Sequence, residues 1–112
     1  MYGTEKQIEY AEDIIFKAYS HIDSIIEHFK EENKICSEKW IPMNNDVISA
    51  AGHVREWIDD CVNRVDDAYK WIAMKDMFSV PQINQKINKY TRVLSKRRGS
   101  IESIQLDVYY KP

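Results

Sequence analysis

The chain has little of what builds catalytic loops, disulfide frameworks or membrane spans. Its 112 residues include three glycines, three prolines and two cysteines. So few glycines leave little room for phosphate-cradling loops or dinucleotide-binding turns. The cysteines, Cys36 and Cys61, show no Cys-x-x-Cys pairing, which favours a reducing, cytoplasmic setting. No apolar run approaches the roughly 20 residues that span a bilayer, and no secretion signal is recognised, so we expect no membrane association.

What the chain does have is two long stretches in which apolar residues recur at alternating three- and four-residue steps. The first covers residues 8–29 and the second covers 47–72. This spacing is typical of helices that pack on one another. With 44% hydrophobic and 30% charged residues, the composition is that of an ordinary globular domain. We predict an all-α fold, a bundle of two long antiparallel helices with a shorter third helix.

The first helix is expected over residues 5–32. Thr4 and Gln7 have capping-box spacing, in which each side chain bonds the backbone N–H of the other residue. The next segment, 33–45, contains Pro42 and loses the helical period. We therefore expect 33–45 to be a connection.

Two further helices are expected after this connection. Asn45 is a candidate N-cap for a helix over about 46–76, a range without proline. Ser79 and Gln82 repeat the capping-box spacing and predict a shorter helix over about 80–98. Together these elements describe one helical domain over residues 1–112.

The segment 101–110 has a different pattern. Apolar and polar residues alternate along it, which is the period of a β-strand. A single strand needs a partner for its backbone groups. The segment 34–41, a second copy of the chain and the sheet edge of another protein all remain open as partners, and a helix also fits part of the pattern.

Charge is distributed unevenly along the chain. Residues 1–78 contain nine Lys/Arg against sixteen Asp/Glu, whereas residues 79–112 contain seven against two. Such asymmetry can indicate contact with nucleic acid or with an acidic partner. The two parts can equally neutralise one another within the fold.

Acidic residues of the second predicted helix recur at a seven-residue step and would form an acidic stripe. Its members are Glu56, Asp59, Asp60, Asp66 and Asp67. A solvated helix face explains the stripe without any function. Alternatively, the stripe imitates phosphates and occupies the basic cleft of a nuclease or another nucleic-acid protein.

Two tryptophans, Trp57 and Trp71, border the same apolar seam. Large aromatic side chains there can widen the core to admit a third helix. If they are exposed, they would anchor a protein partner, because Trp and Arg supply many interface hot spots.

The third predicted helix is basic, with Tyr90 interleaved among its cations. The basic residues are Lys86, Lys89, Arg92, Lys96, Arg97 and Arg98. Binding to phosphate explains this set, and so does favourable positive charge near a helix C-terminus.

No residue pattern predicts a metal, a cofactor or a catalytic centre. His21, His28 and His53 could in principle meet in space, but the three- or four-residue ligand spacings that place two metal ligands on one helical face are absent. No glycine elbow accompanies a candidate nucleophile. We therefore expect a protein without enzymatic activity.

Two short segments resemble a family of small bacterial proteins common on phages and other mobile elements. Residues 3–8, Gly-Thr-Glu-Lys-Gln-Ile, are followed by Tyr10-Ala11-Glu12, where the family pattern has Trp-Ala-Glu. Residues 68–72, Ala-Tyr-Lys-Trp-Ile, are similar to a second family segment, although Ala73 stands where an aspartate is common. The resemblance covers some sixteen residues and carries no catalytic residue over.

The resemblance implies a phage or mobile-element setting, in which small proteins often act by stoichiometric binding to host machinery, inhibitors of CRISPR nucleases among them. We therefore expect a non-enzymatic protein-binding module that uses the acidic stripe to inhibit a host defence nuclease. The alternative is a nucleic-acid-binding accessory protein that uses the basic helix. A homodimer is also expected, because two long helices expose more apolar seam than a short third helix covers.

Overall fold

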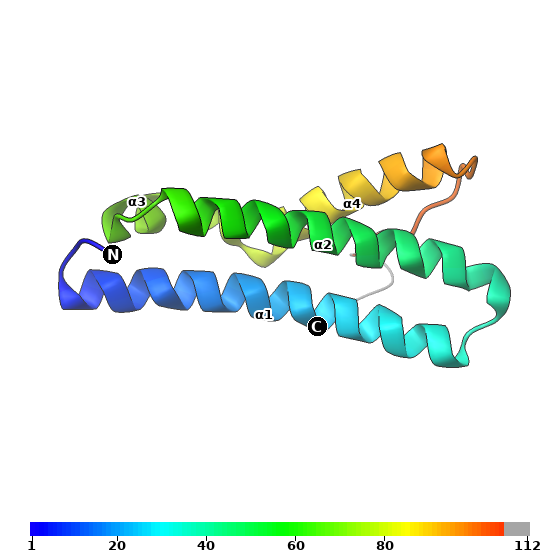
Figure 1. Cartoon of the computed structure of the whole chain (residues 1–112), viewed down its shortest axis with the longest axis horizontal. Coiled ribbons are helices and arrows are strands. Elements are labelled where there is room, and N and C mark those ends of the chain that lie inside the picture. Colours follow the sequence, from blue (N-terminus) through cyan, green and yellow to red (C-terminus); the bar gives the residue numbers. More distant parts are fainter. Residues whose placement is uncertain (107–112) are drawn as a thin grey trace.

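The computed structural model describes residues 1–106, and the regular structure within them is helical (Figure 1). The elements in order are α1 (Glu5–Ile35), a 3₁₀ turn (Glu38–Trp40), α2 (Ile41–Arg64), α3 (Ala68–Ala73), a second 3₁₀ turn (Lys75–Phe78) and α4 (Val80–Arg97). Helices α1 and α2 form a long antiparallel hairpin, and α4 packs mainly on α2. The predicted all-α fold is confirmed. Within residues 1–106, none of the helices combines the length and the hydrophobicity that a membrane span requires.

The core lies where the two apolar seams meet. On α1 the small residues Ala11 and Ala18 are buried, and on α2 so is Ala51, which lets the helix backbones approach closely. The larger Ile22 and Ile58 are fully buried between them. Helix α4 adds its own isoleucines to this core. The seams therefore pack against each other, as their spacing predicts.

The connection between the long helices is shorter than the predicted 33–45. Helix α1 continues to Ile35 and α2 begins at Ile41, so Pro42 lies in the first turn of α2. Proline is tolerated there because its missing N–H would have no helical partner. Because α2 begins at Ile41, Asn45 lies inside the helix, and its predicted role as the N-cap is wrong.

Helix α2 ends at Arg64, so the prediction of one helix over 46–76 is also wrong. The break at 65–67 is held by the N-terminal segment. The N–H of Tyr2 donates to the carbonyl of Asp66 at 2.8 Å, and the N–H of Ala68 donates to the carbonyl of Tyr2 at 2.8 Å. Asp67 then accepts the N–H of Tyr69 at 2.9 Å and caps α3. Tyr2 lies more than 60 residues away from this break along the sequence, so a local pattern does not reveal its two bonds.

Gly3 occupies the tightest point of this junction. Its φ is +141°, and a Cβ at this position would lie 3.0 Å from the Cβ of Ala68. Gly3→Ala is therefore expected to lower the free energy of unfolding by about 1–3 kcal/mol. Gly52→Ala is the matched control, because no atom lies within 4 Å of its added Cβ and alanine favours the helix by about 0.5–1 kcal/mol. Urea unfolding compares the two, and equal stability of both variants would contradict this view of the junction.

Helix α4 begins and ends close to the predicted bounds of 80–98, but its predicted capping box does not form. Ser79 occupies the N-cap position without a side-chain cap bond, because its hydroxyl donates to the carbonyl of Asp76 at 2.9 Å. At the other end Gly99 has a φ of +82°, and the N–H of Ser100 donates to the carbonyl of Ser95 at 2.9 Å. This left-handed glycine turns the chain back along α4.

Residues 101–106 form no strand, contrary to the predicted β segment. Ile104 and Leu106 are buried, and the N–H of Leu106 donates to Asn88 Oδ1 at 3.0 Å. The side chain of Asn88 therefore satisfies a backbone group that a strand partner would otherwise satisfy. The segment 34–41 is largely helical, so it offers no strand edge within the chain. Residues 107–110 of the predicted strand lie outside the described residues.

Candidate functional site

The outer face of α4 concentrates positive charge. Residues 80–101 contain six Lys/Arg and no Asp/Glu. Helix α4 buries a face that includes Ile83, Ile87 and Thr91, which turns the basic side chains toward the outside. The inner face of α4 is partly polar, and a hydrogen bond of 2.7 Å between Asn84 Oδ1 and His21 Nε2 joins it to α1. The charged face is therefore held by a well-packed scaffold.

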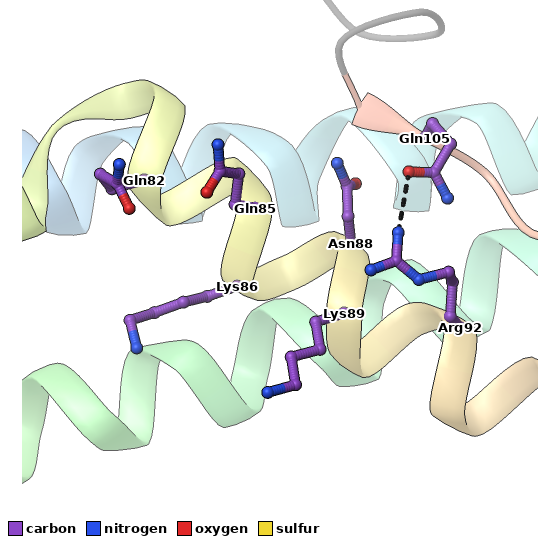
Figure 2. A pocket seen from close by; sticks show the side chains of 7 residues that line it. All are labelled: Gln82, Gln85, Lys86, Asn88, Lys89, Arg92 and Gln105. Atoms are coloured by element: carbon purple, nitrogen blue, oxygen red, sulfur yellow. Dashed lines mark hydrogen bonds between the residues drawn. The ribbon is translucent and has the colours of Figure 1, made fainter.

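Lys86 and Lys89 form what we call the lysine pair, which borders two grooves. The first, the polar groove, has a volume of about 530 Å³. Carboxamides line most of it, and Arg92 completes it beside Gln105 (Figure 2). The remaining lining residues are Gln82, Gln85 and Asn88. In Figure 2 Gln85 and Asn88 point away from the side to which the lysine pair extends.

The second groove, here called the aromatic groove, lies between α4 and α2 and has a volume of about 460 Å³. Besides the lysine pair, it is lined by His53, Tyr90, Val93, Leu94 and Arg97. The rings of His53 and Tyr90 are stacked, with centroids 5.7 Å apart and planes inclined by 28°. No carboxylate of the described residues lines either groove, although Glu56 Oε2 lies 3.9 Å from His53 Nδ1.

Some of the cations have structural partners. Lys86 Nζ lies 4.3 Å from the ring centroid of Trp57, a cation–π contact that joins α4 to α2. Arg98 Nη2 lies 2.6 Å from Asp46 Oδ2, which also accepts the Ser95 hydroxyl at 2.8 Å. Because the Asp46 side chain is only 12% exposed, this ion pair anchors Arg98 to a buried carboxylate, although the Arg98 side chain itself stays 36% exposed.

Other cations are available to a ligand. Within residues 1–106, Lys89, Lys96 and Arg97 form no ion pair, and all three are exposed. Arg92 makes only a long hydrogen bond of 3.4 Å to Gln105 Oε1. The outer face of α4 therefore carries positive charge that no ion pair within residues 1–106 neutralises.

The acidic stripe does not form one continuous helical face, because α2 ends at Arg64 and its last two members follow that end. Asp60 pairs with Arg64 at 2.8 Å. Asp66 lies 3.2 Å from the amino group of Met1, and Asp67 caps α3. Asp59 accepts the hydroxyl of Tyr19 at 2.5 Å. These carboxylates therefore already have partners within the protein.

The two tryptophans differ in their surroundings. Trp71 is fully buried, and its Nε1–H donates to the carbonyl of Val65 at 2.9 Å. Trp57 is half-buried and stacks on Phe78, with ring centroids 5.0 Å apart. Trp71 therefore widens the core, which was one of the two interpretations of its position, and it is not available to a partner.

The Tyr19–Asp59 contact has a measurable signature. Burial of the phenol raises the pKa of Tyr19 to about 12, assisted by its hydrogen bond to Asp59 and by the negative charge of that carboxylate. Since this pKa lies above the ordinary value of 10, the contact stabilises the fold fully below pH 10 and is lost as the pH rises toward 12. We expect the alkaline difference titration at about 295 nm between the wild-type protein and Tyr19→Phe to show a midpoint near 12. A midpoint at the ordinary value of 10 would contradict both the burial of the Tyr19 phenol and its hydrogen bond to Asp59.

Comparison of the chain with protein-family models, curated proteins and solved structures finds no match to any of the three. Any statement about activity therefore depends on the geometry of the chain itself. Among the described residues, no group of three or more His, Cys, Asp or Glu side chains is placed to hold a metal ion.

The sequence predicts the cations of this site but not the residues that shape it. Its patterns offer His53 only as a candidate metal ligand and assign no role to the carboxamides of the polar groove. Residues Lys86, Tyr90, Val93 and Arg97 follow each other at steps of four, three and four, so the shared face could have been recognised from their spacing. The contributions of His53 and Gln105 come from other elements and have no such signal.

Proposed function

We propose that this chain is a non-enzymatic nucleic-acid-binding protein whose contact surface is the outer face of α4. The observation that carries this proposal is the uninterrupted positive charge of residues 80–101, with Lys89, Lys96 and Arg97 unpaired among the described residues. Neutralising phosphates with such cations releases condensed counterions, which is the main source of sequence-independent affinity.

The lining of the two grooves supports this proposal. Carboxamide side chains in the polar groove can donate to phosphate oxygens and to base edges, and no carboxylate of residues 1–106 lines the groove to repel phosphate. The acidic hairpin of α1 and α2 would repel phosphate elsewhere on the molecule. The charge asymmetry would therefore orient a nucleic acid toward α4.

Inhibition of a host defence nuclease through the acidic stripe has less support from the geometry. Its carboxylates are divided by the end of α2, and three of them already bind Arg64 or Tyr19 or cap α3.

An accessory protein of a phage or mobile element would meet its nucleic acid in the host cytosol, which is the location we propose.

Fluorescence anisotropy with a labelled 20-nucleotide DNA or RNA tests the proposal directly. We expect saturable binding of the wild-type chain at near-physiological salt with a Kd of about 1–100 µM, the range of sequence-independent binding. The control variant Glu56→Gln with Asp60→Asn removes charge from the acidic stripe and is expected to bind at least as tightly. Absence of any anisotropy change at several hundred micromolar protein would overturn the proposal.

A further inference from the structure

We infer that the aromatic groove selects single-stranded over double-stranded nucleic acid, by stacking unpaired bases on the shelf formed by His53 and Tyr90. This inference rests on the proposed function and names its ligand class. Tyr90 is 45% exposed and the His53 side chain is 53% exposed. The two rings are already stacked on each other. An incoming base can therefore extend an existing stack without reorganising the protein.

The residues along the groove offer contacts for both the phosphates and the bases of a single strand. Lys86, Tyr90, Val93 and Arg97 lie at i, i+4, i+7 and i+11, so they share one face of α4. Cations occupy both ends of this row, and an aromatic and an apolar side chain lie between them. Phosphates would contact the cations while bases contact Tyr90 and Val93. Stacking of this kind tolerates any sequence, because every base has a π face.

The length of the row limits how much of a strand it holds. Eleven residues of α-helix separate Lys86 from Arg97, which corresponds to about 16 Å. At about 3.4 Å per nucleotide of a stacked strand, this span accommodates about five nucleotides.

The surroundings of α4 disfavour a duplex. The major groove of DNA is about 12 Å wide and admits one helix. Helix α2 flanks α4 along the aromatic groove through His53, and Gln105 flanks it at the polar groove. In a duplex the base faces are also stacked on each other, so the His53–Tyr90 shelf would have nothing to contact.

The test compares a labelled single-stranded 12-nucleotide DNA, the same RNA sequence and the corresponding DNA duplex in anisotropy titrations at one salt concentration. We expect at least one single strand to bind the wild-type chain about 10-fold more tightly than the duplex. Tyr90→Ala is expected to weaken single-strand binding about 5- to 100-fold, because stacking on an aromatic side chain contributes that much per base. It should leave duplex binding within about twofold.

Tyr90→Phe is the matched control, because it keeps the ring and is expected to bind the single strand within about twofold of the wild type. A second readout is ultraviolet cross-linking of a 5-bromouracil-containing strand, followed by mass spectrometry of the modified peptide. We expect the cross-link at Tyr90 or His53.

The outcomes separate this inference from the proposed function. If no nucleic acid binds, both fail. If the duplex binds as tightly as the single strands, or if Tyr90→Ala binds single strands like the wild type, bases do not stack on the His53–Tyr90 shelf. The proposed nucleic-acid binding then still stands. Far-ultraviolet circular dichroism and urea unfolding of Tyr90→Ala show whether the fold is retained. If it is not, His53→Ala gives the same comparison from α2.

Discussion

Reversing the charge of Lys89 and Arg97 together is expected to lower the affinity for a single-stranded oligonucleotide about 100-fold or more. Both side chains are exposed, line the aromatic groove and form no ion pair within residues 1–106. Lys89→Glu with Arg97→Glu would remove two of the proposed phosphate contacts and place two repulsive carboxylates in the groove. Fluorescence anisotropy at fixed salt measures the change.

The matched control is Lys6→Glu with Lys70→Glu, which alters the net charge by the same amount at exposed positions on α1 and α3. Because Lys6 lies in the first turn of α1, an acidic residue there also suits the helix dipole. We expect this control to bind within a few-fold of the wild type. Equal losses in the two double variants would show that overall charge, and not the α4 face, determines binding.

Trp71→Ala is expected to reduce the free energy of unfolding by about 3–5 kcal/mol, the cost of emptying a large buried aromatic site. Trp71 is fully buried, its ring lies 4.9 Å from that of Phe78, and its N–H bonds the carbonyl of Val65 at the break between α2 and α3. The substitution therefore removes packing and leaves a backbone acceptor without its partner. Urea-induced unfolding followed by circular dichroism measures the loss.

Two further variants show how much of this loss of stability comes from the buried position of Trp71 and from the volume of its ring. Trp71→Phe keeps most of the ring volume and is expected to cost clearly less than alanine. Tyr69→Ala changes an exposed aromatic residue on the same short helix and is expected to cost less than about 0.5 kcal/mol. A cost below about 1 kcal/mol for Trp71→Ala would contradict the packing of α3 against the hairpin.

Much of the helical scaffold can be predicted from the sequence because its signals are local or periodic. The first apolar seam identifies α1, and the Thr4–Gln7 capping box forms with both of its bonds present. The second seam identifies α2 but continues into α3 without showing the break between them. Pro42 shows the limit of a local signal, since the same residue breaks a helix in its interior and suits its first turn. Only packing at the hairpin turn decides between these two roles.

The features that could not be predicted depend on contacts between distant residues. The end of α2 depends on backbone bonds from Tyr2, and the course of residues 101–106 depends on the side chain of Asn88. The candidate site divides in the same way. Its cations follow from the sequence of α4, whereas the two grooves need His53 from α2 and Gln105 from the returning chain.

The salt dependence of single-strand binding tests most directly whether the outer face of α4 binds phosphates. If Lys86, Lys89, Arg92 and Arg97 each neutralise one phosphate, a plot of log K against log salt concentration should have a slope of about −3, at roughly 0.7 per phosphate. The slope for Lys89→Gln with Arg97→Gln should then be about half as steep. A wild-type slope near zero, or the same slope for both proteins, would contradict binding through this face.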